Sequence, residues 1–165
     1  MNIYIYSRGE FLNLDSAFLQ GKAIISIKNS DDAFDYSIKS KNLCASSPKM
    51  LQAIFDDVEI DYAPRLDKLE YMYPSLSFLI KNFKEKNKRP VCYFANHHAG
   101  EIIDYIKAHK LSDFIIHCEY GKSRSVTVGK FIADYFRIDT GYRSNRELAV
   151  KNRLVYRVLK EHLVK

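Results

Sequence analysis

Tryptophan is absent from this sequence, and cysteine, proline and glycine are scarce, with 3, 4 and 6 residues among 165. The cysteines, Cys44, Cys92 and Cys118, form no CxxC pair and no ladder with histidine, which excludes a disulfide framework and a structural zinc site. No apolar run approaches the roughly 18 residues that cross a bilayer. The opening MNIYIYSRGE also lacks the basic flank and long apolar stretch of a signal peptide. We therefore expect a cytoplasmic protein without a membrane span, whose cysteines are free thiols.

The composition is that of an ordinary globular protein, with 47% hydrophobic residues and a formal net charge of +6. The length predicts a single domain over residues 1–165. A positive charge favours an anionic partner, but it is also common among proteins that bind nothing acidic. The denser basic groups, at 81–89 and from Arg143 to the C-terminus, are too short for a nucleic-acid-binding arm, so nucleic acid is not expected as a partner.

Short β-branched and aromatic runs alternate with segments of helical spacing. The runs NIYIY, KAIISI, MLQAIF and DFIIHC predict strands at 2–6, 22–27, 50–55 and 113–118. Apolar residues at helical spacing predict helices over 10–18, around 75–84, over 99–106, after Arg124 and near the C-terminus, with 143–151 as a helical lead-in to the last one. The alternation predicts an α/β sandwich with a central, mostly parallel sheet flanked by helices. The long polar stretch around 58–90 is interpreted as an insertion.

The stretch IIHCEYGKSRS, from Ile115 to Ser125, contains two overlapping motifs. Gly121-Lys122-Ser123 looks like the end of a nucleotide-binding loop, G-x-x-x-x-G-K-[ST]. The first glycine of that pattern would fall on Ile116, inside an apolar strand where the backbone cannot turn. The nucleotide-binding interpretation is therefore disfavoured.

Cys118 and Arg124 are separated by five residues on a predicted strand, loop and helix. Such a loop directs several backbone N–H groups into one concavity beside the positive end of the helix dipole, where a dianionic phosphate fits. The same field favours a thiolate over a thiol at Cys118. Arg124 can donate two N–H groups to two phosphate oxygens. The alternative is a buried structural cysteine followed by an unrelated arginine.

Three neighbouring residues make the motif more specific than its spacing alone. Gly121 falls at the tightest part of the curve. Ser125 is placed to hydrogen-bond the cysteine sulfur and ease its departure from phosphorus. His117 is expected to orient the loop through a carbonyl hydrogen bond, with a plain buried histidine as the alternative.

HCEYGKSRS resembles the signature His-Cys-x5-Arg-Ser/Thr of the cysteine-dependent protein phosphatases, and the chain looks closest to their compact dual-specificity-like branch. YSRGE, AIISI, FDD, HHAGEIIDYI and NRLVYRVL follow in the order of that branch. The resemblance implies hydrolysis of a phosphate monoester through a phosphocysteine, with neither metal nor cofactor. It implies Cys118 as nucleophile, Arg124 as phosphate clamp and Ser125 as partner of the leaving thiolate. Main-chain N–H groups would complete the phosphate site, from Glu119, Tyr120, Gly121, Lys122, Ser123 and Arg124.

The mechanism of this family also needs a general acid, normally an aspartate on a loop after another strand. FDD matches that place and favours Asp57, with Asp56 and Asp61 as further candidates. A solvated acidic turn is the alternative. The segment after Asp57 is longer than this branch usually has, so another carboxylate could supply the proton.

Two further groups of residues have both a functional and a structural interpretation. Asn152 matches a position that in relatives supports the active-site loop, and a helix N-cap is its alternative. His97, His98 and Glu101 are close enough on one helix to suggest a metal pair. The mechanism needs no metal, so none is expected there.

The leading hypothesis is a protein tyrosine or dual-specificity phosphatase that acts on a phosphorylated protein. Lys122 raises phosphoinositides or inositol phosphates as an alternative, because relatives that act on these tend to carry a basic residue there. Glu119 counts against it, since that slot often holds another lysine in those enzymes. An RNA 5′-phosphatase is favoured by net charge alone. A phosphate-binding module without turnover and a sulfur-transfer enzyme are the alternatives from other classes.

Overall fold

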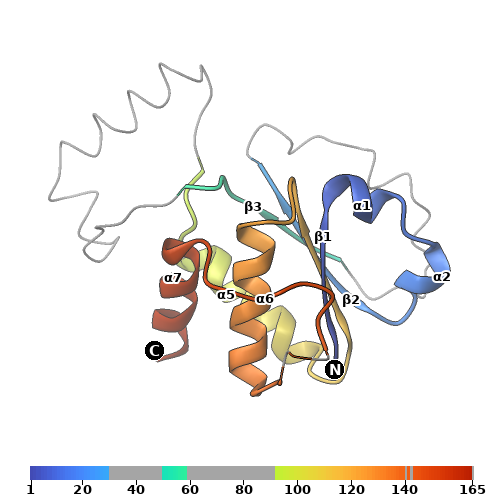
Figure 1. The fold of residues 1–165 in the computed structure, drawn as a ribbon. Helices are drawn as coiled ribbons and strands as arrows, with labels where there is room; N and C mark the ends of the chain where they lie inside the picture. Colours follow the sequence, from blue (N-terminus) through green and yellow to red (C-terminus); the bar gives the residue numbers. More distant parts are fainter. Residues whose placement is uncertain (30–49, 59–91, 140, 142, 165) are drawn as a thin grey trace, which may run out of the picture.

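The structure is a computed structural model, and it describes residues 1–29, 50–58, 92–139, 141 and 143–164. Its sheet has four strands in the order β1-β4-β2-β3, and every neighbouring pair is parallel (Figure 1). The strands are β1 (Ile3–Ser7), β2 (Ala23–Lys28), β3 (Leu51–Ile54) and β4 (Phe114–Cys118). The predicted α/β fold with a parallel central sheet is confirmed.

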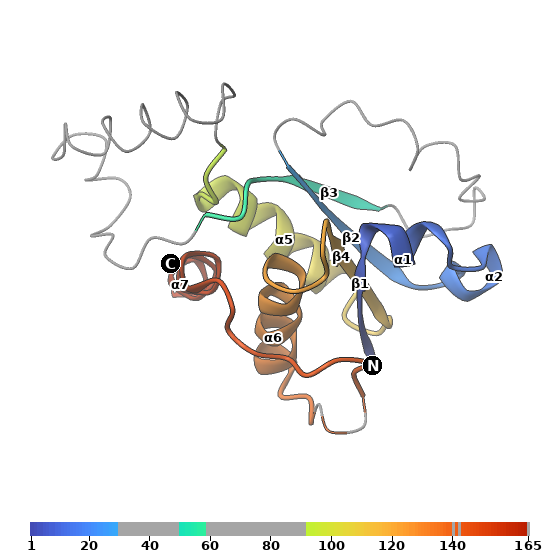
Figure 2. The ribbon, with the colours of Figure 1, turned by 45° about the horizontal axis from the view of Figure 1, so that its top comes forward.

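Helices cover both faces of this sheet (Figures 1 and 2). The short helices α1 (Arg8–Leu12) and α2 (Ser16–Leu19) lie on one face, and α5 (Asn96–Ala108), α6 (Arg124–Phe136) and α7 (Arg153–Leu163) lie on the other. The side chains of β1 alternate accordingly. Ile3 and Ile5 join the larger core under the three long helices, whereas Tyr4 and Tyr6 pack into the smaller core around Phe11.

The central strands β2 and β4 are buried along their whole length. Strands that are buried along their whole length are typical of parallel sheets that are covered on both faces. Gly129 lets α6 approach β1, because a Cβ there would come within 2.8 Å of Ile5 Cδ1. α6 thereby packs closely over β1 and β4.

The predicted helix over 10–18 is two short helices. α1 begins earlier, because the Ser7 side chain accepts from Glu10 N and the Glu10 side chain accepts from Ser7 N in a capping box. Asp15 then caps α2, since its side chain accepts from Ala17 N. Two caps within nine residues divide the helical pattern.

The predicted helical lead-in over 143–151 is wrong. Its first residues, 143–145, instead follow the outer edge of β1, where Ile3 N donates to Arg143 O at 2.8 Å. The Asn145 side chain accepts from Ile5 N at 2.7 Å and donates to Ile5 O at 3.0 Å. The main-chain groups of an edge strand need hydrogen-bond partners. This extended segment supplies them, and it therefore does not form a helix.

The structure leaves two of the predicted features undescribed. The helix expected around 75–84 and nearly all of the insertion around 58–90 lie outside the described residues. Among the residues that the structure describes, no helix is long and apolar enough to cross a bilayer.

Candidate active site

The carboxyl ends of the four parallel strands lie along one edge of the sheet, which is where ligands bind in folds of this type. Ser7 at the end of β1 is in register with Cys118 at the end of β4, and Lys28 at the end of β2 with Ile54 at the end of β3. The loop 119–123 leaves β4 at this edge and leads directly into α6. The predicted strand, loop and helix around Cys118 are therefore present.

Cys118 and Ser125 meet at the start of α6. Cys118 Sγ lies 3.1 Å from Ser125 Oγ, and both side chains are buried. Ser125 stands in the first turn of the helix, beside the main-chain N–H groups that have no partner within it. The structure thus brings together the sulfur and the hydroxyl that the sequence pairs.

Arg124 is buried, with 3% of its surface exposed, although it carries a charge. Its Nη1 donates to Phe55 O at 2.6 Å and lies 3.5 Å from Lys28 O, so the guanidinium is held at the ends of β2 and β3. Within the described part of the chain, its Nε is buried without a hydrogen-bond partner. A buried N–H without an acceptor lowers folding stability unless a ligand accepts its hydrogen bond, and a phosphate oxygen can do so.

The middle of the loop lies against the junction of β1 and α1. Gly121 has φ of +66°, and a Cβ there would come within 2.6 Å of Ser7 N. Only glycine fits this position without displacing the backbone. Nearby, Arg8 N donates to Glu119 O at 3.2 Å, and the Arg8 guanidinium pairs with the Glu119 carboxylate at 3.4 Å.

The two aspartates that follow β3 have different surroundings. Asp57 is exposed, and its Oδ1 accepts from Ser123 Oγ at 2.8 Å and from Asn152 Nδ2 at 2.9 Å. Asp56 is buried; its Oδ2 accepts from Cys92 N at 2.9 Å, and its own N–H donates to Cys92 O at 2.8 Å. Asp57 therefore reaches the last residue of the loop, whereas Asp56 connects two chain segments. Asp61 lies outside the described residues.

Asn152 makes contacts through both ends of its side-chain amide. It is the N-cap of α7, because its Oδ1 accepts from Val155 N at 3.0 Å. Its Nδ2 donates to Asp57 Oδ1 and lies 3.3 Å from Val58 O. One amide side chain thus begins a helix with its oxygen and holds the Asp57 loop with its nitrogen.

His117 does not make the expected carbonyl hydrogen bond within the described part of the chain, where neither of its ring nitrogens has a partner. Its ring instead stacks on Phe11, with centroids 4.0 Å apart. Burial lowers the pKa of His117 to about 3, and the charges of Lys28 and Arg8 act in the same direction. The imidazole is therefore neutral at physiological pH, and α1 fixes it by packing rather than by a hydrogen bond.

The histidines on α5 have structural partners. His98 Nδ1 accepts from Ala95 N at 3.0 Å, and burial lowers the pKa of His98 to about 4, with a smaller effect from His97. Among the described residues, no group of three His, Cys, Asp or Glu side chains is arranged to hold a metal. His98 and Ala95 together form the capping interaction at the start of α5.

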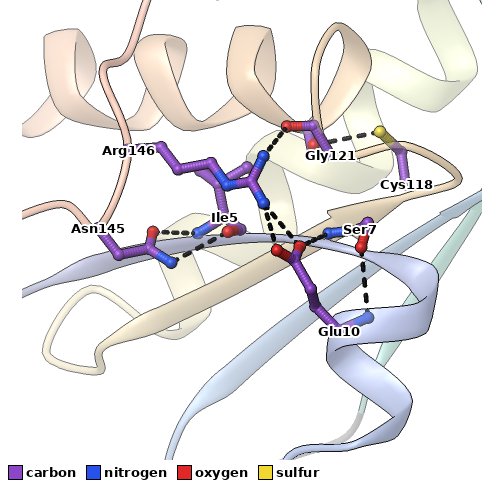
Figure 3. Close-up of polar contacts among 8 residues, drawn as sticks. Ile5, Ser7, Glu10, Cys118, Gly121, Asn145 and Arg146 are labelled. Atoms are coloured by element: carbon purple, nitrogen blue, oxygen red, sulfur yellow. Dashed lines mark hydrogen bonds and ion pairs between the residues drawn. The ribbon is translucent and has the colours of Figure 1, made fainter.

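The sequence did not single out Arg146 and Glu10 (Figure 3). Arg146 Nη1 donates to Gly121 O at 3.2 Å, and its Nη2 lies 2.6 Å from both carboxylate oxygens of Glu10. The pattern Ser7-x-x-Glu10 has the form of a capping box and could have indicated Glu10. Nothing in the sequence joins Arg146 to the loop, because their contact depends on the path of 143–146 along β1.

A separate cleft of about 730 Å³ lies at the opposite edge of the sheet. It is lined by Met1, Lys110, Phe136, Arg137, Ile138, Asp139 and Arg143. None of the described residues that line it is a cysteine or a histidine.

Comparisons with known proteins agree with the fold. No protein-family model and no curated protein matches the sequence. Among solved structures, the chain is similar to the crystal structure of Tk-PTP in its active form. The TM-score is 0.53 at 17% identity, and the alignment covers 100% of this chain and 93% of that one. The chain therefore has the fold of Tk-PTP.

Proposed function

We propose that the protein hydrolyses phosphate monoesters through a phosphocysteine at Cys118, without a metal ion. The observation that carries this proposal is the 3.1 Å approach of Cys118 Sγ to Ser125 Oγ at the start of α6, beside the buried Arg124. A structural cysteine needs neither this hydroxyl nor a buried guanidinium next to its loop. A cysteine that accepts and releases a phosphoryl group uses both.

In the first step, the Cys118 thiolate attacks phosphorus and the bond between phosphorus and the ester oxygen breaks. The leaving oxygen keeps the electron pair and takes a proton from the Asp57 carboxyl group. Arg124 and the N–H groups of the loop hold the three remaining phosphoryl oxygens. The Nε of Arg124, which has no hydrogen-bond partner among the described residues, supports this role.

In the second step, water attacks the phosphorus of the phosphocysteine and gives a proton to the Asp57 carboxylate. The S–P bond breaks and its electron pair returns to sulfur. Ser125 stabilises the departing thiolate by donating its hydroxyl hydrogen to Sγ. Inorganic phosphate leaves, and both Cys118 and Asp57 return to their starting forms.

We propose phosphotyrosine in proteins as the substrate, with phosphoserine and phosphothreonine as further members of the same class. Tyr120 supports this assignment, because it is 72% exposed on the loop and offers an aromatic surface to a phosphotyrosine ring or a peptide. The name of the similar structure, Tk-PTP, favours the same class.

Inositol phosphates are the second candidate, and a contact in the structure weakens the objection that the sequence raises against them. The acidic Glu119 argues against a second phosphate at the loop. In the structure its carboxylate pairs with the Arg8 guanidinium at 3.4 Å, so much of its charge is compensated. Lys122, exposed on the same loop, is then a cation that can meet an additional phosphate.

The test is hydrolysis of para-nitrophenyl phosphate between pH 5 and 8 with EDTA present, comparing wild type with Cys118→Ser and Cys92→Ser. Cys92 is the matched control, because among the described residues its thiol contacts Ile54 O at 3.2 Å and lies away from the loop 119–123. We expect Cys118→Ser to abolish turnover while it still binds phosphate, and Cys92→Ser to remain active.

Other outcomes would change the assignment. Wild-type protein that binds phosphopeptide but turns over no ester is a binding module instead. Cyanide-dependent turnover of thiosulfate would indicate sulfur transfer. Once turnover is established, a comparison of phosphopeptides with inositol phosphates under the same conditions decides between the two substrate classes.

A further inference from the structure

A chain of four polar groups connects the phosphate-binding loop to the start of α1 (Figure 3). Gly121 O accepts from Arg146 Nη1 at 3.2 Å, and Arg146 Nη2 lies 2.6 Å from both Glu10 oxygens. Glu10 Oε2 in turn accepts from Ser7 N at 2.6 Å. The middle of the loop is therefore tied to a helix cap that precedes it by more than a hundred residues.

This connection fixes the direction of one peptide group in the loop. The described residues contain no cis peptide bond. In a trans peptide, the C=O of one residue and the N–H of the next point in opposite directions. Because Gly121 O faces Arg146, the N–H of Lys122 faces away from Arg146. In Figure 3, Gly121 lies between Arg146 and Cys118, so that N–H is directed to the side of the loop where Cys118 lies.

A second carbonyl of the loop is held in the same manner. Glu119 O accepts from Arg8 N at 3.2 Å, so the N–H of Tyr120 points away from α1. Two alternate carbonyls are thus bound from the outside, by Arg8 N and by Arg146. The N–H groups of Tyr120 and Lys122, on the opposite side of these two peptide groups, can then face a ligand, which is the arrangement of an anion-binding nest.

We propose that Arg146 and Glu10 are positioning residues of the phosphate site. Arg146 holds the Gly121 carbonyl outward and thereby presents the Lys122 N–H to phosphate, and Glu10 orients Arg146. This inference rests on the proposed phosphate site at Cys118. Neither side chain touches the reacting atoms.

Arg146 and Glu10 are too exposed for their ion pair to contribute much to folding stability, so a positioning role can be distinguished from a structural one. Arg146 is 30% exposed and Glu10 is 48% exposed, and ion pairs at such positions add little to folding stability. A flexible loop needs its peptide groups oriented before phosphate binds, however, and a misoriented carbonyl would repel the anion. Loss of Arg146 should therefore weaken phosphate binding much more than it lowers the melting temperature.

The experiment is calorimetric titration with inorganic phosphate, together with KM and kcat for para-nitrophenyl phosphate and melting temperature. The variants are Arg146→Met, Glu10→Gln and the double variant, with Arg157→Met as the matched control. Arg157 is an arginine of similar exposure, 37%, that pairs with Glu161 on α7 at 4.0 Å. We expect Arg146→Met to weaken phosphate binding about tenfold, the scale of one lost hydrogen bond to a charged group, and to raise KM. The melting temperature should match that of Arg157→Met.

Glu10→Gln should show a smaller loss, and the double variant should bind phosphate no more weakly than Arg146→Met, because both residues act through one contact. Phosphate binding by Arg146→Met equal to that of Arg157→Met would overturn the inference and leave the phosphatase proposal standing. If Arg146→Met does not fold, Arg146→Lys decides, since it keeps the charge but replaces the two guanidinium nitrogens that contact Gly121 O and Glu10 by a single ammonium nitrogen. Wild-type binding by that variant also overturns the inference. A wild-type protein that neither binds phosphate nor hydrolyses the ester overturns both proposals.

Discussion

Asn152 Nδ2 donates to Asp57 Oδ1 at 2.9 Å, while Asn152 Oδ1 caps α7 by accepting from Val155 N. The same oxygen of Asp57 also accepts a hydrogen bond from Ser123 Oγ at 2.8 Å. The two donors hold the carboxyl group beside the end of the loop 119–123. This geometry makes the role of Asp57 testable separately from that of Asn152.

Replacing Asp57 by asparagine should slow the hydrolysis of esters with poor leaving groups about 100-fold or more, the usual contribution of a general acid. Activated aryl phosphates should be affected far less, because their phenolate leaves without a proton. The measurement is kcat/KM across a series of aryl phosphates whose phenols differ in acidity. Equal rates of wild type and Asp57→Asn on the poorest leaving groups would contradict the assignment.

Asp56→Asn is the matched control for this variant. The Asp56 carboxylate accepts from Cys92 N inside the protein, so this substitution should lower the melting temperature. The dependence of the rate on the leaving group should stay that of the wild type. A steeper dependence in Asp56→Asn than in Asp57→Asn would move the general acid to Asp56.

Asn152→Ser should separate the two functions of the asparagine. Serine keeps an oxygen that caps α7, so the melting temperature should stay near that of wild type. Its side chain carries no amide to reach Asp57, so hydrolysis of poor leaving groups should fall severalfold. Asn152→Ala removes the cap as well and should cost about 1 kcal/mol of folding stability. Chemical denaturation and the same aryl phosphate series measure the two effects; a rate loss in Asn152→Ala but not in Asn152→Ser would make the role purely structural.

Gly121→Ala should damage both the fold and the phosphate site. A methyl group there would meet Ser7 N at 2.6 Å, and φ of +66° is strained for any other residue. We expect a loss of about 1–3 kcal/mol of folding stability together with weaker phosphate binding. Gly9→Ala is the control, because Gly9 lies in α1 with nothing within 4 Å of its added Cβ. Alanine should stabilise that helix by about 0.5–1 kcal/mol, so the two variants should differ in sign.

The strands and the strand-loop-helix around Cys118 could be predicted from sequence because they depend on local patterns. Short apolar runs such as 114–116 mark buried parallel strands, and the spacing from Cys118 to Arg124 belongs to one uninterrupted segment. The contact between Ser125 and Cys118 follows from the same segment. These features required no knowledge of how distant parts of the chain meet.

What could not be predicted depends on tertiary contacts. The segment 143–151 precedes the predicted C-terminal helix, yet its first residues bind the edge of β1 through Asn145 and Ile5. That same path brings Arg146 to Gly121. His117 stacks on Phe11 because α1 folds back over β4, a packing that sequence spacing does not encode. In each case a partner more than 20 residues away decides the outcome.

Folding stability should fall with acid because of His117, whose ordinary pKa of 6.5 is lowered to about 3 in the folded protein. Below pH 6.5, His117 is protonated in the unfolded chain, whereas it stays neutral in the folded protein until the pH approaches 3. Protonation thus favours the unfolded state, and stability is lost as the pH falls from 6.5 toward 3. Each pH unit in this window removes up to about 1.4 kcal/mol for one such group.

His117→Met should therefore flatten the decline in stability between pH 6.5 and 4, because it removes the titrating ring from contact with Phe11. Urea denaturation at several pH values measures the slope, and His109→Gln is the control, since His109 sits at the C-terminal end of α5 and contacts Tyr105 O. If His117 does not carry a proton in catalysis, His117→Met should retain turnover at pH 7. An unchanged pH slope would mean that another group controls acid stability, and loss of turnover in a folded variant would give the imidazole a part in the chemistry.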